Sequence, residues 1–178
     1  MSNSAQKTAT PLTDTASKFL TFDLHGGVYG IPILDVREII ALQPITPLPR
    51  MPAAVEGVIN LRGRIIPVLD LRCSLNLDQG ERDRSTCVVV LDIEANDQTS
   101  MHIGCIVDAV REVSSVHSSD VQDPPSVGTS MESDYILGLA NPDGTDYVIT
   151  LLDMRFVLAE FVNAIGLDTL SMLNEEVV

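Results

Sequence analysis

The hydrophobic pattern of the chain consists mainly of short aliphatic runs separated by turn-forming residues. Runs of about four to eight residues rich in Val, Ile and Leu favour β-strands over helices. They predict strands over residues 19–24, 28–33, 57–61, 65–71, 86–93, 101–107, 136–140 and 146–152, with a further segment over 108–116. Residues 35–42 fit either a strand or one to two helical turns, and the prolines between 43 and 53 predict an extended connector. A short helical turn is expected over 70–77, and a helical stripe predicts a helix over 155–173.

A hairpin over residues 56–72 is the most informative part of this pattern. Two apolar runs flank Arg62, Gly63 and Arg64, and a glycine there can adopt the positive φ of a tight turn. Because aliphatic residues fill both arms, we expect the hairpin to be buried on both faces, with a basic tip of two arginines left exposed. Such a tip indicates a docking surface for an acidic partner.

Three short motifs occur twice in the same order. Residues 36–39 are echoed at 110–113, residues 68–72 at 151–155, and the hairpins between them place Gly57 and Gly63 opposite Gly138 and Gly144. Three ordered matches favour internal duplication over chance. Each copy has only four or five short strands, which predicts two small barrels that stabilise one another, with a groove between them suited to a helix.

Charge narrows the class of partner. Lys and Arg total 11 against 25 Asp and Glu, a net charge of −14, so phosphate backbones and anionic lipid head groups would be repelled. We therefore expect no nucleic-acid partner. Residues 1–17 lack the features of a signal peptide and read as a flexible tail, and no apolar run approaches the ~20 residues of a membrane span. The sequence predicts a cytoplasmic protein without membrane insertion.

Residue types suited to catalysis or metal binding are present but form no motif. The three cysteines, Cys73, Cys87 and Cys105, are widely spaced without a Cys-x-x-Cys pair, which fits a reducing compartment and predicts no metal site. Cys73 with His102 or His117 as a base is a conceivable nucleophile, but no flanking motif supports it. No glycine-rich phosphate loop is found. We therefore expect no enzymatic activity and no cofactor.

Several motifs together resemble those of the CheW family, the adaptors of bacterial chemotaxis arrays. They are Phe19 and Leu20; Tyr29, Gly30 and Ile31; Glu38; residues 47–52; Gly57 and Val58; residues 60–63; residues 68–72; and residues 104–113. The resemblance spans about residues 18–162 and implies a mainly β fold. It implies two small SH3-like five-stranded β-barrel subdomains that share a hydrophobic interface, with short helices and a C-terminal helix. Residues 163–178 would then form the C-terminal helix and an acidic tail.

The resemblance also implies a function. Adaptors of this family link the cytoplasmic tip of a chemoreceptor (a methyl-accepting chemotaxis protein) to the regulatory domain of the histidine kinase CheA, and they catalyse no reaction. A CheW-like adaptor of a pilus-motility or other chemosensory pathway is an alternative, and so is a small-ligand-binding β-barrel module with a closed apolar pocket.

Candidate site residues follow from the same resemblance. The receptor-facing groove would comprise Val36, Glu38, Ile39, Asn60, Leu61 and Arg62, with Arg62 held near Glu38 by charge-assisted hydrogen bonds. A solvated tip arginine is the alternative for Arg62, and plain core packing is an equal alternative for Val36 and Ile39. Residues 107–113 would line the second half of the groove in a mainly structural role. Gly57, Gly63 and Pro67 are expected to meet backbone requirements of the hairpin.

Overall fold

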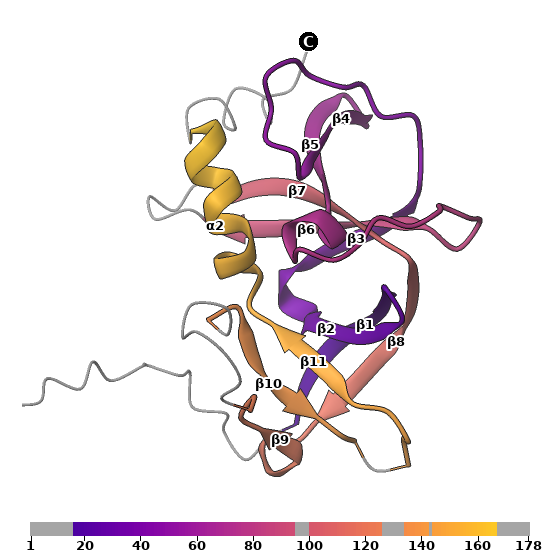
Figure 1. Cartoon of the computed structure of the whole chain (residues 1–178), viewed down its shortest axis with the longest axis vertical. Coiled ribbons are helices and arrows are strands. Elements are labelled where there is room, and N and C mark those ends of the chain that lie inside the picture. Colours follow the sequence, from indigo (N-terminus) through magenta and orange to yellow (C-terminus); the bar gives the residue numbers. More distant parts are fainter. Residues whose placement is uncertain (1–15, 95–99, 126–133, 143, 167–178) are drawn as a thin grey trace, which may run out of the picture.

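Two mixed β-sheets form most of the computed structural model, which describes residues 16–94, 100–125, 134–142 and 144–166 (Figure 1). The five-stranded sheet has the order β3-β6-β7-β5-β4. Its strands are β3 (Val36–Ala41), β4 (Val55–Leu61), β5 (Arg64–Asp70), β6 (Cys87–Glu94) and β7 (Ser100–Val107).

The six-stranded sheet is built from both ends of the chain, in the order β8-β1-β2-β11-β10-β9. Its strands are β1 (Ser17–Leu24), β2 (Gly27–Pro32), β8 (Ala109–Val116), β9 (Val121–Gln122), β10 (Ile136–Ala140) and β11 (Ile149–Leu152). The described helices are η1 (Ile33–Asp35), α1 (Leu71–Ser74), η2 (Ser118–Asp120) and α2 (Met154–Ile165). In the described part of the chain, no helix has the length and apolar character of a membrane span.

The two sheets repeat one arrangement of strands. In each sheet two antiparallel pairs (β3–β6–β7 or β8–β1–β2) are followed by a parallel pair (β7–β5 or β2–β11) and an antiparallel hairpin (β5–β4 or β11–β10). The motifs that occur twice in the sequence therefore lie at equivalent places in the two sheets. The repeats are not consecutive halves, because β1 and β2 complete the sheet whose other strands follow residue 108.

Both faces of the middle strands are buried. On β6, Val88 and Val90 belong to a cluster within the five-stranded sheet, whereas Val89 and Leu91 belong to a larger cluster that both sheets and α2 share. A third cluster, around Phe19 and other residues, lies within the six-stranded sheet. Side chains alternate between faces along a strand. Burial on both faces explains why these strands are continuous apolar runs in the sequence.

Helix α2 closes the shared cluster at one side, beside β6 and β7 (Figure 1). Asp153 caps its first turn, because its side chain accepts a hydrogen bond from the Arg155 N–H. Met154, Leu158 and Phe161 are buried at helical spacing and pack in the cluster shared with both sheets. The helix thus begins before residue 155, and residues 167–173 of the predicted helix lie outside the described residues.

The expected fold class is confirmed as a mainly β protein with two mixed sheets, short helices and a C-terminal helix. One sheet has six strands rather than five, because the two-residue strand β9 pairs with β10. Residues 35–42 form mainly a strand, β3, preceded by the short helix η1. The predicted strand over 146–152 is shorter in the structure and starts at Ile149. The expected tails at 1–17 and 163–178 fall largely outside the described residues.

Candidate functional site

The turn between β4 and β5 is tighter than the sequence predicts. The two strands stay paired as far as Leu61 and Arg64, so the turn contains only Arg62 and Gly63. Both residues have positive φ, 52° and 84°, the pattern of the hairpin turn that matches strand twist. Asn60 Oδ1 accepts a hydrogen bond from the Gly63 N–H at 3.0 Å. The expectation of two arginines at the tip is wrong, because Arg64 is half-buried in β5.

Arg62 and Glu38 form a bidentate ion pair. Arg62 Nη1 donates to Glu38 Oε1 at 2.9 Å, and Nη2 donates to Oε2 at 2.8 Å. Glu38 lies on β3 and Arg62 follows β4, the two edge strands of the five-stranded sheet, so the pair joins opposite edges of this sheet. The carboxylate is largely covered at 19% exposure, whereas the arginine side chain is 73% exposed. The pair therefore presents a held, solvent-facing guanidinium.

The other candidate groove residues divide between surface and core. Ile39 is 45% exposed and follows Glu38 on β3, so its side chain points to the opposite face of the strand. Val36 is half-buried against the cluster that the two sheets share, and Leu61 packs on the cluster within the five-stranded sheet. Asn60 is engaged in the turn. The structure thus brings Glu38 and Arg62 together, leaves Ile39 exposed on the other face of β3, and gives Val36 and Leu61 packing contacts.

Backbone geometry accounts for the glycines and the proline of the hairpin. Gly57 has φ 148°, and a Cβ there would lie 2.1 Å from the Thr46 carbonyl oxygen. The Gly63 position is spatially open, so only its φ of 84° favours glycine. Pro67 pairs with Val58, and the parallel pairing of β5 with β7 starts one residue later, which tolerates a strand proline.

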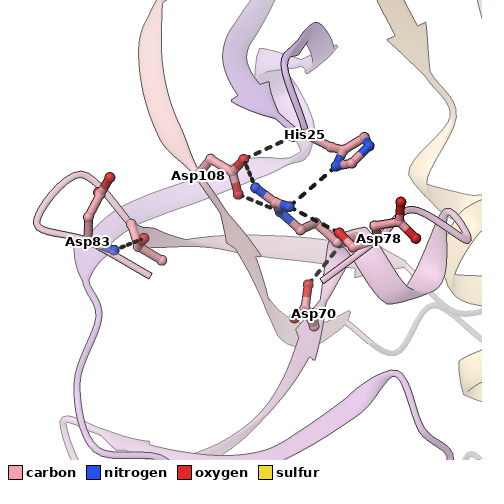
Figure 2. A network of polar contacts seen from close by, with 7 residues as sticks. His25, Asp70, Asp78, Asp83 and Asp108 are labelled. Atoms are coloured by element: carbon pink, nitrogen blue, oxygen red, sulfur yellow. Dashed lines mark hydrogen bonds and ion pairs between the residues drawn. The ribbon is translucent and has the colours of Figure 1, made fainter. Parts of the chain in front are cut away.

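A second polar network, which sequence reasoning missed, joins the two sheets (Figure 2). Asp108 lies where the chain passes from β7 to β8, and Arg72 lies on α1. Arg72 Nε donates to Asp108 Oδ1 at 2.9 Å and Nη2 donates to Oδ2 at 2.5 Å. The backbone N–H of His25, between β1 and β2, also donates to Asp108 Oδ2, at 2.9 Å. Arg72 Nη1 donates to the Asp78 carbonyl at 3.0 Å.

The electrostatics of this network favour its charged form. Burial alone would raise the pKa of Asp108, but the hydrogen bonds from Arg72 and from the His25 N–H outweigh burial and lower it. The hydrogen bond to Asp108 in turn raises the pKa of Arg72. Helix α1 follows β5 of the five-stranded sheet, and His25 lies between β1 and β2 of the six-stranded sheet. The network around Asp108 therefore holds the two sheets in a fixed relative position. The signal in the sequence was that Arg72 and Asp108, which have opposite charges, each directly follow an apolar run.

In the described part of the chain, the cysteines and the other titratable groups form no metal-binding cluster. Cys105 is buried in β7, and burial raises its pKa to about 12, so it remains a neutral thiol. His102 is also buried there, and burial, followed by the nearby Arg37, lowers its pKa. Across residues 16–94, 100–125, 134–142 and 144–166, no group of three or more His, Cys, Asp or Glu side chains is placed to hold a metal ion.

Comparison with known proteins adds the family context. Residues 18–161 match the model of the CheW-like domain. The chemotaxis protein CheW of Treponema pallidum is 35% identical, over 79% of this chain and 81% of that protein. Protein FrzA of Myxococcus xanthus is 28% identical, over 79% of this chain and 84% of that protein. The crystal structure of the scaffolding protein TtCheW from Thermoanaerobacter tengcongensis matches with a TM-score of 0.69 and 31% identity, covering 80% of this chain and 92% of that one.

Proposed function

Since the chain belongs to the CheW family of non-enzymatic chemotaxis scaffold proteins, we propose that it links the cytoplasmic tip of a chemoreceptor to the regulatory domain of a CheA-type histidine kinase. Such a scaffold acts by holding two partners at a fixed relative position, so that binding of one raises the effective concentration of the other. It needs two separate surfaces and no reactive group.

The Glu38–Arg62 pair supports a receptor-binding role for this end of the five-stranded sheet. Arg62 is 73% exposed, yet two hydrogen bonds to Glu38 fix its guanidinium in place. A fixed guanidinium loses less side-chain entropy on binding than a mobile one and fits a carboxylate of a partner in a defined direction. A receptor helix that presents an acidic side chain complements this surface.

Arg62→Ala tests this role, with Arg37→Ala as the matched control. Arg37 is an exposed arginine of β3 whose Nη1 lies 3.9 Å from Asp92 Oδ2, and among the described residues it forms no ion pair with Glu38. Isothermal titration with a purified receptor cytoplasmic fragment should show at least about tenfold weaker binding for Arg62→Ala, the loss expected of an interface contact worth about 1.4 kcal/mol. Melting temperature should change little, because the Arg62 side chain that is removed is 73% exposed. Unchanged affinity, or loss of folding, would contradict the proposal.

The scaffold role itself is tested by pull-down. The tagged full chain, incubated with lysate of the chemotactic bacterium that encodes it, should retain both a chemoreceptor and a CheA-type kinase. Recovery of neither protein would refute the scaffold role. The identity of the recovered kinase would also assign the chain to its pathway.

A further inference from the structure

Arg64 is a charged residue at the start of β5 to which the proposed function gives no role. It is half-buried and directly follows the turn that carries Arg62. Side chains alternate along a strand, and Ile66 and Val68 belong to the cluster within the five-stranded sheet, so Arg64 points to the same face as they do. Leu61, which pairs with Arg64, also packs on that cluster. Arg64 therefore lies at the edge of this cluster, next to the turn.

The ion pair of Glu38 with Arg62 lies on the same face and at the same end of this sheet. On β3, Ile40 packs on the cluster within the five-stranded sheet, and Glu38, two residues before it, points to the same face. Strands β3 and β5 run in the same direction, because β6 is antiparallel to both β3 and β7, and β7 is parallel to β5. Glu38 and Arg64 both lie in the first half of their strands. The ion pair and Arg64 therefore share one end of the sheet.

A buried histidine supports this placement of Arg64. Burial contributes most to the lowered pKa of His102, followed by Arg37, and Arg64 acts in the same direction. Asp92 and Glu38 act in the opposite direction and raise that pKa. One histidine thus senses charges from β3, β5 and β6 together. Arg64 therefore belongs to the same cluster of polar groups as the ion pair that contains Glu38.

Arg64 has no carboxylate partner within the described part of the chain. Both carboxylate oxygens of Glu38 accept hydrogen bonds from Arg62, and Asp92 Oδ2 lies 3.9 Å from Arg37 Nη1. Three arginines therefore face two carboxylates at this end of the sheet, although the whole chain has a net charge of −14. An unpaired charge is costly to bury, so the guanidinium of Arg64 reaches water in the free protein. An acidic partner supplies the missing carboxylate.

The spacing of the two arginines of the hairpin suits an α-helix. Residues 62 and 64 are two positions apart, so their Cα atoms are at most about 7 Å apart. Side chains three or four positions apart on a helix have Cβ atoms about 5–6 Å apart. Building on the proposed receptor-binding function, we infer that Arg64 binds a second carboxylate of the receptor helix, one turn from the carboxylate that Arg62 binds. Arg64 thus makes the site selective for a helix with two acidic side chains over a helix with one.

Arg64→Met in the full-length chain tests the inference, because methionine removes the charge and keeps most of the aliphatic part of the side chain. Its matched control is Arg84→Met, at an exposed arginine that forms no ion pair with any described residue. Titration with a purified receptor cytoplasmic fragment should show binding about 3- to 10-fold weaker for Arg64→Met and unchanged for Arg84→Met. The loss should shrink as salt is added, because salt screens the contact. The melting temperature should stay the same or rise, because an unpaired, partly buried charge is removed.

Two further variants separate the charge of Arg64 from its packing. Arg64→Lys keeps the charge and should retain more affinity for the receptor fragment than Arg64→Met does. Arg64→Glu should bind most weakly, and reversal of one acidic residue of the fragment to Lys should restore its binding. Double-mutant cycles should place that acidic residue three or four positions from the one coupled to Arg62. Arg64→Glu and its restoration decide the question if Arg64→Met does not fold.

The outcomes distinguish this inference from the proposed function. Unchanged receptor affinity of Arg64→Met, together with the expected loss for Arg62→Ala, would overturn the inference and leave the proposed function standing. So would equal losses for Arg64→Met and Arg64→Lys, an equal loss for Arg84→Met, or the absence of any charge reversal that restores binding of Arg64→Glu. A wild-type chain that does not bind the receptor fragment would refute the receptor-binding role, and this inference with it.

Discussion

Replacing Asp108 by alanine should destabilise the protein far more than removing an exposed ion pair of equal length. The substitution leaves Arg72, whose side chain is 16% exposed, with the Asp78 carbonyl as its main remaining acceptor. It also removes the acceptor of the His25 N–H. Breaking a fully buried pair costs about 3–5 kcal/mol. Because Asp108 is 30% exposed, water replaces part of the loss, and we expect about 2–3 kcal/mol.

Asp23→Ala is the matched control. Arg111 Nε lies 2.5 Å from Asp23 Oδ1, as short as the Arg72–Asp108 contact, but the two side chains are 39% and 37% exposed. An exposed pair contributes about 0–1 kcal/mol. In a chain of this size each kcal/mol shifts the melting temperature by about 2–4 °C. Asp108→Ala should therefore melt about 4–12 °C below the wild type, and Asp23→Ala at most about 4 °C below.

Thermal and urea unfolding of the two variants and the wild type decide the question. Urea unfolding gives the free energy of unfolding directly, and an unchanged slope would show that the folded state keeps its compactness. Equal destabilisation of the two variants would refute the reasoning, since it would mean that burial does not set the value of these pairs. A larger effect for Asp23→Ala would refute it as well.

Two further predictions concern backbone geometry and pH. Gly57→Ala should lower the free energy of unfolding, measured in urea, by about 3 kcal/mol or more, because the new Cβ would lie 2.1 Å from the Thr46 carbonyl oxygen. Gly63→Ala should lower it by only about 1–2 kcal/mol, because that position is open and only the left-handed backbone conformation is strained. Equal losses in the two variants would contradict this reasoning. Burial, followed by Arg37, lowers the pKa of His102 in the folded state, so protonation favours unfolding. The free energy of unfolding should fall, by at most about 1.4 kcal/mol per pH unit, as pH drops below about 6.5, and His102→Gln should flatten that dependence.

Most strands were predictable from the sequence because the middle strands are buried on both faces. Continuous aliphatic runs such as those of β6 and β7 fit few other structures. The exception is β3, where half-buried and exposed residues alternate and residues 35–42 read equally as helix or strand. Its pairing with β6, about fifty residues away, decides the conformation. The local sequence pattern of β3 cannot predict this long-range pairing. The same holds for the two residues of β9, which form a strand because they pair with β10.

The polar contacts were harder to predict than the strands. Glu38 and Arg62 lie at opposite edges of one sheet, and their contact depends on the curvature of that sheet rather than on spacing along the chain. Only the family resemblance indicated it. Asp108 is an ordinary polar residue in the sequence. Its importance comes from partial burial and from the donors that surround it, and hydrophobic periodicity reports neither.

The internal repeat distinguishes ion pairs that recur in both sheets from charged residues that occur in one sheet only. The ion pair of Arg37 with Asp92 joins β3 to β6, and the pair of Arg111 with Asp23 joins β8 to β1, the equivalent strands of the other sheet. A pair that recurs at the same place in both sheets serves the arrangement of strands that they share. Arg62 has no such counterpart, since the corresponding sequence position is Asp143, of opposite charge. The strand arrangement that the two sheets share therefore does not require Arg62. This residue is free to serve the receptor contact proposed above without a loss of that arrangement.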